Sequence, residues 1–320
     1  MKLYQNEIPM PFQPRKLSFV GIAFVLALLL SASSLAPHRA SAQTAQAATP
    51  TISGAAHFIQ IATSSNTLGD FTLLNNIATN NLPNAILFVT SNVSPFAVPH
   101  TSDPHPVGLW YDTGVNEWGI FNEDQTSMPL GAAFSVLVVP KAGGSVFVQT
   151  AAPFNSSGDS TFLNNVFTNG QPAAQLLITQ NWNPGGVGGA YNPHNVGVWY
   201  STGAKQWTIF NEDQAKMPST NFNVMVGAGA SGGGTELLQT VTSSNRSGDS
   251  TSINNTATNN LPNAILFVTP NFNPGSISGT YDPHPVGVRY DTGSGQWAIL
   301  NEDGASMPLS AAFNILAFAS

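Results

Sequence analysis

The chain repeats itself three times over most of its length. The stretch SDPHPVGLWYDTGVNEWGIFNED at 102–124 returns as YNPHNVGVWYSTGAKQWTIFNED at 191–213 and as YDPHPVGVRYDTGSGQWAILNED at 281–303. Matching residues lie 89 and then 90 positions apart. A unit of roughly 85 residues is too long for a solenoid repeat and has the size of a small domain.

The repeat divides the chain into three copies. We place copy 1 at 53–140, copy 2 at 144–228 and copy 3 at 233–320. Short linkers join them, KAGG at 141–144 and the glycine-rich SGGG at 231–234. Because each copy is large enough for a small core, we expect three domains in a row, each folding around its own apolar residues.

The hydrophobic pattern within each copy is typical of β-strands. In copy 1 the runs HFIQIAT, AILFVT, VGLWYD, EWGIFNE and AAFSVLVV are separated by clusters of Gly, Pro, Asn and Asp. The residues at 113–116 fit a hairpin turn between the third and fourth runs. The sequence therefore predicts an all-β protein of three tandem small antiparallel β-sandwich or barrel domains.

The N-terminal residues 1–42 have the pattern of a signal peptide. Arg15 and Lys16 precede an apolar run at 17–30, and the small residues ASA at 40–42 fit a cleavage site. The apolar run is shorter than the roughly 20 residues that span a bilayer, which argues against the alternative of an uncleaved anchor. We therefore expect a secreted or cell-surface protein with no membrane span after cleavage.

Charge excludes one class of partner. Without the leader, the chain has five Lys and Arg against fifteen Asp and Glu, a formal net charge of −10. A nucleic-acid partner would need basic clusters that replace counterions on the phosphates, so we expect none. The chain also lacks cysteine, so packing and backbone hydrogen bonds must hold the fold together.

Acidic residues and histidines recur at matching positions in all three copies. This group comprises Asp103, His105, Glu123 and Asp124 in copy 1, His194, Glu212 and Asp213 in copy 2, and Asp282, His284, Glu302 and Asp303 in copy 3. Asp and Asn cluster before tight turns because they bond their own backbone, and we favour this structural interpretation.

A structural cation is the alternative use of the same group, since carboxylates and one imidazole suit a hard or borderline metal. Against it, Asp103 becomes Asn192 in copy 2, and no common metal-binding spacing occurs. Adjacent Glu123 and Asp124 also point to opposite faces if the strand continues that far, so only one could join a given site. We expect no cofactor.

Paired carboxylates could also hydrolyse glycosides, which makes a hydrolase a third possibility. The sequence has no nucleophile elbow and no Cys/His pair. Each copy is also small for both a core and a deep cleft. We therefore expect a protein that is not an enzyme.

Aromatic residues offer a different kind of site. In VGLWYD of copy 1, strand alternation directs Leu109 and Tyr111 to one face and Trp110 to the other. The residues that match Trp110 are Trp199 and Arg289, and an arginine is rarely buried without a partner. We therefore expect Trp110 and Trp199 to be exposed.

A second aromatic pair, Trp182 and Phe272, stands in the loops NWNP and NFNP. Exposed aromatic rings beside Asn and Asp could form a platform for sugars, and weak sites in tandem gain by avidity. Packing of these rings between neighbouring copies is the alternative. The buried aromatic residues should instead be Trp118, Trp207 and Trp297.

The motifs NWNP, YNPHxVGVWY, QWxIFNED and MP, followed by a run like AAFNVLV, resemble a domain of unknown function that occurs, often in tandem, in exported bacterial proteins. All three copies carry the pattern, with departures at SNVSP in copy 1 and at Arg289 in copy 3. The resemblance implies export and a tandem architecture and assigns no catalytic residue.

Together these observations favour an exported, non-enzymatic tandem-repeat protein with a structural or adhesive role at the surface. The main alternative is a carbohydrate-binding array that uses Trp110, Trp199, Trp182 and Phe272. Its partners would be cell-surface or extracellular polysaccharides or other surface proteins.

Overall fold

Each copy of the repeat forms seven β-strands in the computed structural model, which describes residues 54–227, 233–276 and 279–319. The predicted leader at 1–42 lies outside the described residues. Copy 1 contains β1 (Ala56–Ile61), β2 (Thr67–Leu68), β3 (Phe71–Leu74), β4 (Ile86–Asn92), β5 (Val107–Asp112), β6 (Glu117–Asn122) and β7 (Ala133–Val139).

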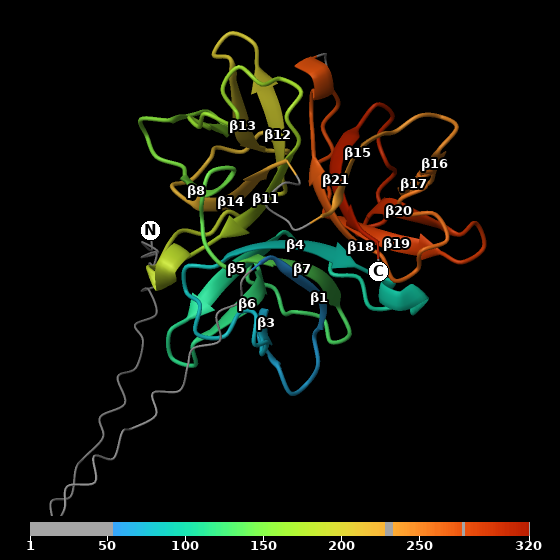
Figure 1. Ribbon diagram of the computed structural model, residues 1–320, viewed down its shortest axis with the longest axis horizontal. Helices are drawn as coiled ribbons and strands as arrows, with labels where there is room; N and C mark the ends of the chain where they lie inside the picture. Colours follow the sequence, from blue (N-terminus) through green and yellow to red (C-terminus); the bar gives the residue numbers. More distant parts are fainter. Residues whose placement is uncertain (1–53, 228–232, 277–278, 320) are drawn as a thin grey trace, which may run out of the picture. The chain divides into compact units, whose positions relative to one another are not determined.

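The other two copies repeat this order (Figure 1). Copy 2 contains β8 (Val146–Thr150), β9 (Ser156–Ser157), β10 (Ser160–Phe162), β11 (Leu176–Asn181), β12 (Val196–Ser201), β13 (Gln206–Asn211) and β14 (Asn221–Val226). Copy 3 contains β15 (Thr235–Thr240), β16 (Arg246–Ser247), β17 (Ser250–Ile253), β18 (Ile265–Pro270), β19 (Val286–Asp291), β20 (Gln296–Asn301) and β21 (Ala312–Phe318). One turn of 3-10 helix follows the fourth strand of each copy, at Pro95–Ala97, Pro184–Gly186 and Pro274–Ser276.

Two antiparallel sheets pack face to face in each copy. In copy 1 the inner sheet has the order β1-β7-β4 and the outer sheet the order β2-β3-β6-β5, and copies 2 and 3 follow the same plan. The predicted hairpin joins β5 to β6, with Val107 opposite Asn122 and Asp112 opposite Glu117. The all-β prediction is confirmed, and the architecture is the sandwich rather than the barrel.

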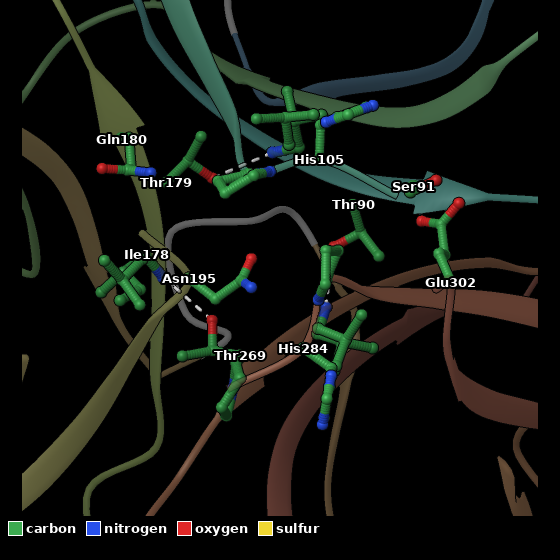
Figure 2. Close-up of a pocket in the computed structure, with 18 of the residues that line it drawn as sticks. Thr90, Ser91, His105, Ile178, Thr179, Gln180, Asn195, Thr269, His284 and Glu302 are labelled. Atoms are coloured by element: carbon green, nitrogen blue, oxygen red, sulfur yellow. Dashed lines mark hydrogen bonds between the residues drawn. The ribbon is translucent and has the colours of Figure 1, made fainter. Parts of the chain in front are cut away.

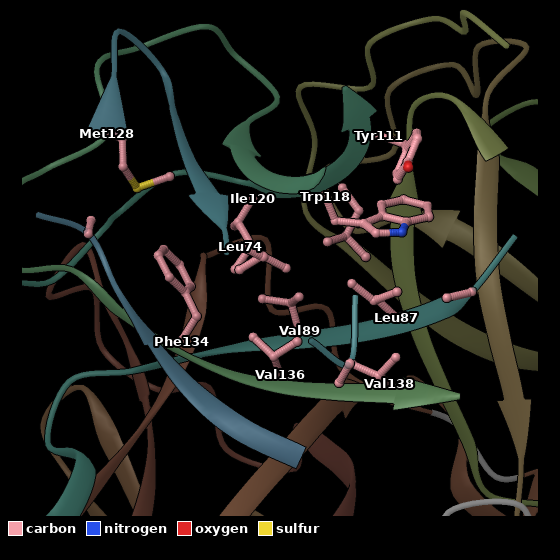
Figure 3. Packing of buried hydrophobic residues seen from close by; sticks show 14 of the residues in the cluster. Leu74, Leu87, Val89, Tyr111, Trp118, Ile120, Met128, Phe134, Val136 and Val138 are labelled. Carbon is pink, nitrogen blue, oxygen red and sulfur yellow. The ribbon is translucent and has the colours of Figure 1, made fainter. Parts of the chain in front are cut away.

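The alternation of side chains along the strands fills the space between the two sheets. Figure 3 shows Leu87 and Val136 from the inner sheet meeting Ile120 and Trp118 from the outer sheet. Trp118 and its counterparts Trp207 and Trp297 are fully buried, as predicted. Each indole also donates a hydrogen bond to a loop carbonyl 36 residues earlier in its own copy. The three tryptophans are therefore the centres of three separate sandwich cores.

Strand pairing continues from one copy into the next. The outer edge strand β5 of copy 1 pairs in parallel with the inner edge strand β11 of copy 2, and β19 of copy 3 pairs in parallel with β4 of copy 1. Between copies 2 and 3 the same contact is a single bridge from Val198 to Asn271. Each copy therefore pairs through one edge strand of its outer sheet and one edge strand of its inner sheet. The three pairings join copy 1 to copy 2, copy 2 to copy 3 and copy 3 to copy 1, so they form a cycle.

The inner sheets share a further core. Strands β4 and β7 are buried along their whole length because one face covers the core of copy 1 and the other faces copies 2 and 3. This shared core comprises Ile86, Phe88, Leu137 and Val139 from copy 1, Val146, Leu177 and Met225 from copy 2, and Ile265, Phe267, Leu316 and Phe318 from copy 3.

Three threonines tie the inner strands together in the same cyclic order. The Oγ1 of Thr179 accepts a hydrogen bond from the N–H of Val89 at 3.0 Å. The Oγ1 atoms of Thr269 and Thr90 accept the equivalent bonds, from Ile178 at 3.1 Å and from Val268 at 2.9 Å. Strands β4, β11 and β18 therefore meet side by side (Figure 1).

The prediction of three tandem β domains is confirmed, but the copies do not stand apart from one another as beads in a row. All described residues belong to one unit by their contacts. Each copy does have its own sandwich core, but it also contributes apolar residues to the shared core and edge strands to both neighbours. A linear arrangement would leave those apolar faces and strand edges in water. Within the described ranges, no helix has the length and apolar character needed to cross a membrane.

The cyclic arrangement makes a prediction about an isolated copy. Residues 233–320 expressed alone should fold around Trp297 but expose Phe267, Leu316 and Phe318 of the shared core. Because each copy carries both halves of a head-to-tail interface that closes after three units, the fragment should self-associate into trimers. Analytical ultracentrifugation measures this, with residues 43–320, which hold all three copies, as the control. A soluble monomeric fragment as stable as the complete chain would contradict the shared core.

Candidate ligand-binding site

The recurrent histidines pair with the aspartates of their own copies. His105 Nδ1 lies 2.8 Å from Asp124 Oδ2, and the equivalent pairs, His194 with Asp213 and His284 with Asp303, lie 2.7 and 2.6 Å apart. Each aspartate also accepts a bond from a backbone N–H two residues later, which closes the turn after the sixth strand. These pairs therefore join the loop before the fifth strand to the turn after the sixth.

The glutamate next to each of these aspartates points to another copy. Glu123 Oε2 accepts a hydrogen bond from the backbone N–H of Asn192 at 3.0 Å. Glu212 accepts the same bond from Asp282 at 3.0 Å, and Glu302 accepts it from Asp103 at 2.8 Å. All three glutamates are buried. Each one therefore closes one of the three interfaces between copies.

Glycine makes room for these glutamates. A Cβ atom on Gly108 would lie 2.1 Å from Glu123 Oε1, and one on Gly197 would lie 2.1 Å from Glu212 Oε1. A Cβ atom on Gly287 would lie 2.6 Å from Glu302 Oε1. The glycine of the motif VGVWY therefore leaves room for the carboxyl group that joins one copy to the next.

Burial dominates the electrostatics of the interfaces. Loss of solvation raises the pKa of Glu123 and Glu212 to about 8 and the pKa of Glu302 to about 7. It also raises the pKa of Asp103 and Asp282 to about 6. Copy 2 has Asn192 in place of this aspartate and donates the same backbone N–H. The interface therefore depends on the buried glutamate and tolerates either Asp or Asn opposite it.

The proposed metal ligands do not form one cluster. Glu123 turns toward copy 2, Asp124 binds His105, and Asp103 lies beside Glu302 of copy 3. Among the described residues, no group of three or more His, Asp or Glu side chains is placed to hold a metal ion. The paired carboxylates of the hydrolase alternative likewise separate, one into an interface and one into a surface turn.

The three histidines line a small shared pocket where the copies meet. His105, His194 and His284 surround a cavity of about 80 Å³ together with strands β4, β11 and β18. Figure 2 shows Thr90, Thr179 and Thr269 around this space, with the cyclic hydrogen bonds drawn between copies. A volume of this size holds a few water molecules and is too small for a sugar ring.

A larger aromatic cavity lies between copies 1 and 2. Its volume is about 250 Å³, and we call it the first aromatic cleft. The lining residues are Asp70, Phe71, Trp110 and Phe121 from copy 1 and Trp182 and Tyr191 from copy 2. The structure thus brings Trp110 and Trp182, which are 72 positions apart in the sequence, into one site.

Local structure fixes the two tryptophans of this cleft. Trp110 lies opposite Gly119, where a Cβ atom would fall 2.5 Å from the indole Nε1. Trp182 follows β11 and donates its backbone N–H to the carbonyl of Leu109 at 2.8 Å, so the pairing of β5 with β11 sets its position. A Cβ atom on Gly189 would overlap the carbonyl oxygen of Trp182.

The expectation that Trp110 and Trp199 are exposed is wrong. Both are half-buried, because each packs edge to face against a ring of its own copy, Phe71 and Phe162 respectively. The indole of Trp199 also lies 3.3 Å from the hydroxyl of Ser160. Only Arg289, at the matching position of copy 3, is exposed.

Copies 2 and 3 meet through a similar set of residues, the second aromatic cluster. It contains Asp159, Ser160, Trp199 and Phe210 from copy 2 and Phe272 and Tyr281 from copy 3, at the positions that match the first cleft, with Ser160 in place of Phe71. Phe272 donates its N–H to the carbonyl of Val198 at 2.9 Å, as Trp182 does to Leu109. Its ring lies 4.6 Å from that of Tyr281 and 6.0 Å from that of Phe210.

The interface between copies 3 and 1 lacks these aromatic rings. Val93 donates the equivalent backbone bond, to the carbonyl of Val288 at 3.0 Å. Arg289, Leu300 and Ser102 stand where the first cleft has Trp110, Phe121 and Tyr191. The backbone contact is therefore the same at all three interfaces, and two of them have aromatic side chains at the positions that line the first cleft.

The sequence contained a signal for this pairing. Copy 1 departs from the repeat at SNVSP, where Val93 replaces Trp182, and copy 3 departs at Arg289. The structure shows that these two departures face the same interface. Phe71, Phe121 and Tyr191 escaped the sequence analysis. Phe71 and Phe121 lie opposite each other on β3 and β6 of copy 1, and Tyr191 meets Phe121 only when copy 2 packs on copy 1.

The fold and these interfaces define a class of protein, an all-β tandem repeat whose copies close on one another. A family model described as a domain of unknown function (DUF7452) matches the chain three times, at residues 47–138, 108–226 and 219–317. The chain therefore belongs to this family. Searches of curated proteins and of solved structures gave no match.

The buried glutamates predict how stability depends on pH. The folded pKa of Glu123 is about 8 against an ordinary value of 4.5, so the folded state holds its proton more tightly than the unfolded state. This contribution to stability is fully present below pH 4.5 and is lost as the pH rises toward 8. Glu123→Gln cannot ionise. The melting temperature of the variant minus that of the wild type should therefore increase as the pH rises from 5 to 8.

Thermal melts at several pH values measure this difference. Glu117→Gln is the matched control, because it removes a carboxylate from the hairpin of copy 1 without touching the glutamate of the interface. The control should follow the wild type throughout. A difference between Glu123→Gln and wild type that stays constant from pH 5 to 8 would show that this carboxyl group is not held protonated.

Proposed function

We propose that this is an exported, non-enzymatic surface protein that adheres to carbohydrate through the aromatic residues between its copies. The first aromatic cleft is the observation that carries this proposal, since it combines five aromatic side chains, one carboxylate and a cavity of about 250 Å³. Binding pockets are typically concave and mostly apolar, with a few fixed polar groups. The structural role and the carbohydrate-binding role then belong to the same surfaces.

The chemistry of the cleft suits sugars. The C–H faces of a sugar ring pack on aromatic rings, while its hydroxyl groups need a few polar partners such as the Asp70 carboxylate and the Tyr191 hydroxyl. Half-buried rings held by neighbouring side chains lose little freedom on binding, so less of the interaction energy goes into ordering them. Trp110 and Trp182 meet this condition through Phe71 and the backbone of Leu109.

Two related aromatic sites in one chain support an adhesive role. The second aromatic cluster keeps counterparts of Asp70, Trp110, Phe121 and Tyr191, with Phe272 in place of Trp182 and Ser160 in place of Phe71. A polysaccharide offers many copies of the same sugar, so two weak sites on one chain can bind it more tightly than either alone. The leader sequence supports export, which would place these sites where polysaccharides occur.

The carboxylates support a binding role over catalysis. The buried glutamates accept hydrogen bonds across the interfaces, and the aspartates Asp124, Asp213 and Asp303 pair with histidines. A hydrolase of this kind needs two carboxyl groups facing one sugar bond. Asp70 is the one carboxylate among the residues that line the first cleft.

Retention on immobilised polysaccharides tests the proposal. A glycan array identifies a retained polysaccharide, and the double variant Trp182→Ala/Phe272→Ala should lose at least tenfold in affinity for it. Val93→Ala is the matched control at the third interface and should bind like the wild type. Melting curves of all variants show whether the fold is intact. Unchanged retention by a folded double variant, or no retained polysaccharide at all, would remove the carbohydrate role and leave a purely structural one.

A further inference from the structure

The rings of the first aromatic cleft face in several directions. Phe71 and Trp110 meet at 76°, with their centroids 5.3 Å apart. Tyr191 meets Phe121 at 78° and Trp182 at 40°, with centroids 5.8 Å apart in both pairs. A single flat face would suit the stacking of one sugar ring, whereas rings at steep angles can enclose a compact group on several sides.

The cleft carries negative charge without a basic partner. Asp70 is the one charged residue among the six that line the cavity. Within the described ranges, no group donates a hydrogen bond to its carboxylate. Burial, followed by the nearby Asp70 carboxylate, raises the pKa of Tyr191. Because Glu123 is held protonated near neutral pH, Asp70 is the negative charge that lines this cleft. A ligand that enters can therefore supply the missing positive charge.

Aromatic faces together with a carboxylate select one kind of cation. A ring attracts positive charge to its face, and a methylated ammonium group also buries its methyl groups against the ring. A primary ammonium would lose strong hydration in such a cavity and find few acceptors. We propose that the first aromatic cleft binds a quaternary or methylated ammonium group carried by the ligand. This inference rests on the proposed function and narrows it to ligands that bear such a group.

The other two interfaces give an internal comparison. The second aromatic cluster keeps the aspartate, as Asp159, but Ser160 stands in place of Phe71 and donates its hydroxyl to Asp159 at 2.7 Å. At the third interface, Arg289 replaces the tryptophan and would repel a cation. The structure therefore assigns the cation site to the first aromatic cleft, where the carboxylate and all five rings come together.

Two ligands of the same shape, one charged and one neutral, test whether the cleft recognises positive charge. The mature chain, residues 43–320, is titrated with choline and with its neutral isostere 3,3-dimethylbutan-1-ol, and tryptophan fluorescence or calorimetry follows binding. We expect choline to bind at least tenfold more tightly, with one site per chain. Equal affinities for the two probes, or no binding of choline, would overturn the inference.

Variants test the carboxylate. Asp70→Asn should weaken choline binding about tenfold and leave the affinity for the neutral isostere unchanged. Asp249→Asn, at the matching position of the third interface, is the control and should change neither affinity. If Asp70→Asn binds choline like the wild type, the carboxylate has no role and the inference fails, whether or not the variant melts at the wild-type temperature.

The carrier of the ammonium group is tested separately. A choline-substituted polysaccharide should be retained more strongly than the same polysaccharide without choline. Retention of both polysaccharides to the same extent would leave the carbohydrate role standing and contradict the cation site. If the protein binds choline and also phosphatidylcholine vesicles but retains no polysaccharide, the cation site is supported and the carbohydrate role is overturned.

Discussion

The pairing of an outer edge strand in one copy with an inner edge strand in the next is the interaction on which the rest of the structure depends. Sheet edges expose unpaired N–H and C=O groups and invite association with other chains. Here β5 meets β11 and β19 meets β4, and the buried glutamates accept backbone hydrogen bonds beside these pairings. Three sandwiches, each with a modest core of its own, thereby gain a shared core between them.

The same pairing creates the candidate binding site. Trp182 lies near Trp110 because its backbone N–H continues the contact of β11 with β5. Neither copy alone contains the complete first aromatic cleft. Formation of the candidate site and stability are therefore coupled, since a change that loosens the interface between copies 1 and 2 also separates the walls of this cleft. The third interface keeps the backbone contact after losing the aromatic rings, so the rings are not required for closure.

Much of the individual copy could be predicted from the sequence. Strand alternation placed Leu109 and Tyr111 in the core and Trp110 on the opposite face, and the structure agrees. The burial of Trp118 followed from the same argument. The short strands β2 and β3 were not predicted, because FTLL and TL are too brief to show a period. These local features depend on neighbouring residues, which the sequence displays directly.

The contacts between copies could not be predicted in the same way. The repeat shows that the copies have the same fold, but a row and a cycle of copies have the same sequence pattern. Exposure of Trp110 was inferred from Arg289, which holds only if all three interfaces are alike, and they are not. The buried position of Glu123 contradicts the usual preference of glutamate for water, and only the neighbouring copy explains it.

Calorimetry of a core variant tests the closed arrangement most directly. Trp207→Ala empties a fully buried aromatic site in copy 2, a change that typically costs about 3 to 5 kcal/mol. If the copies form one cooperative unit, the mature chain should still unfold in a single transition, and the whole transition should move to a lower temperature. If copy 2 instead melts early while copies 1 and 3 unfold at the wild-type temperature, the copies are independent and the shared core does not couple them.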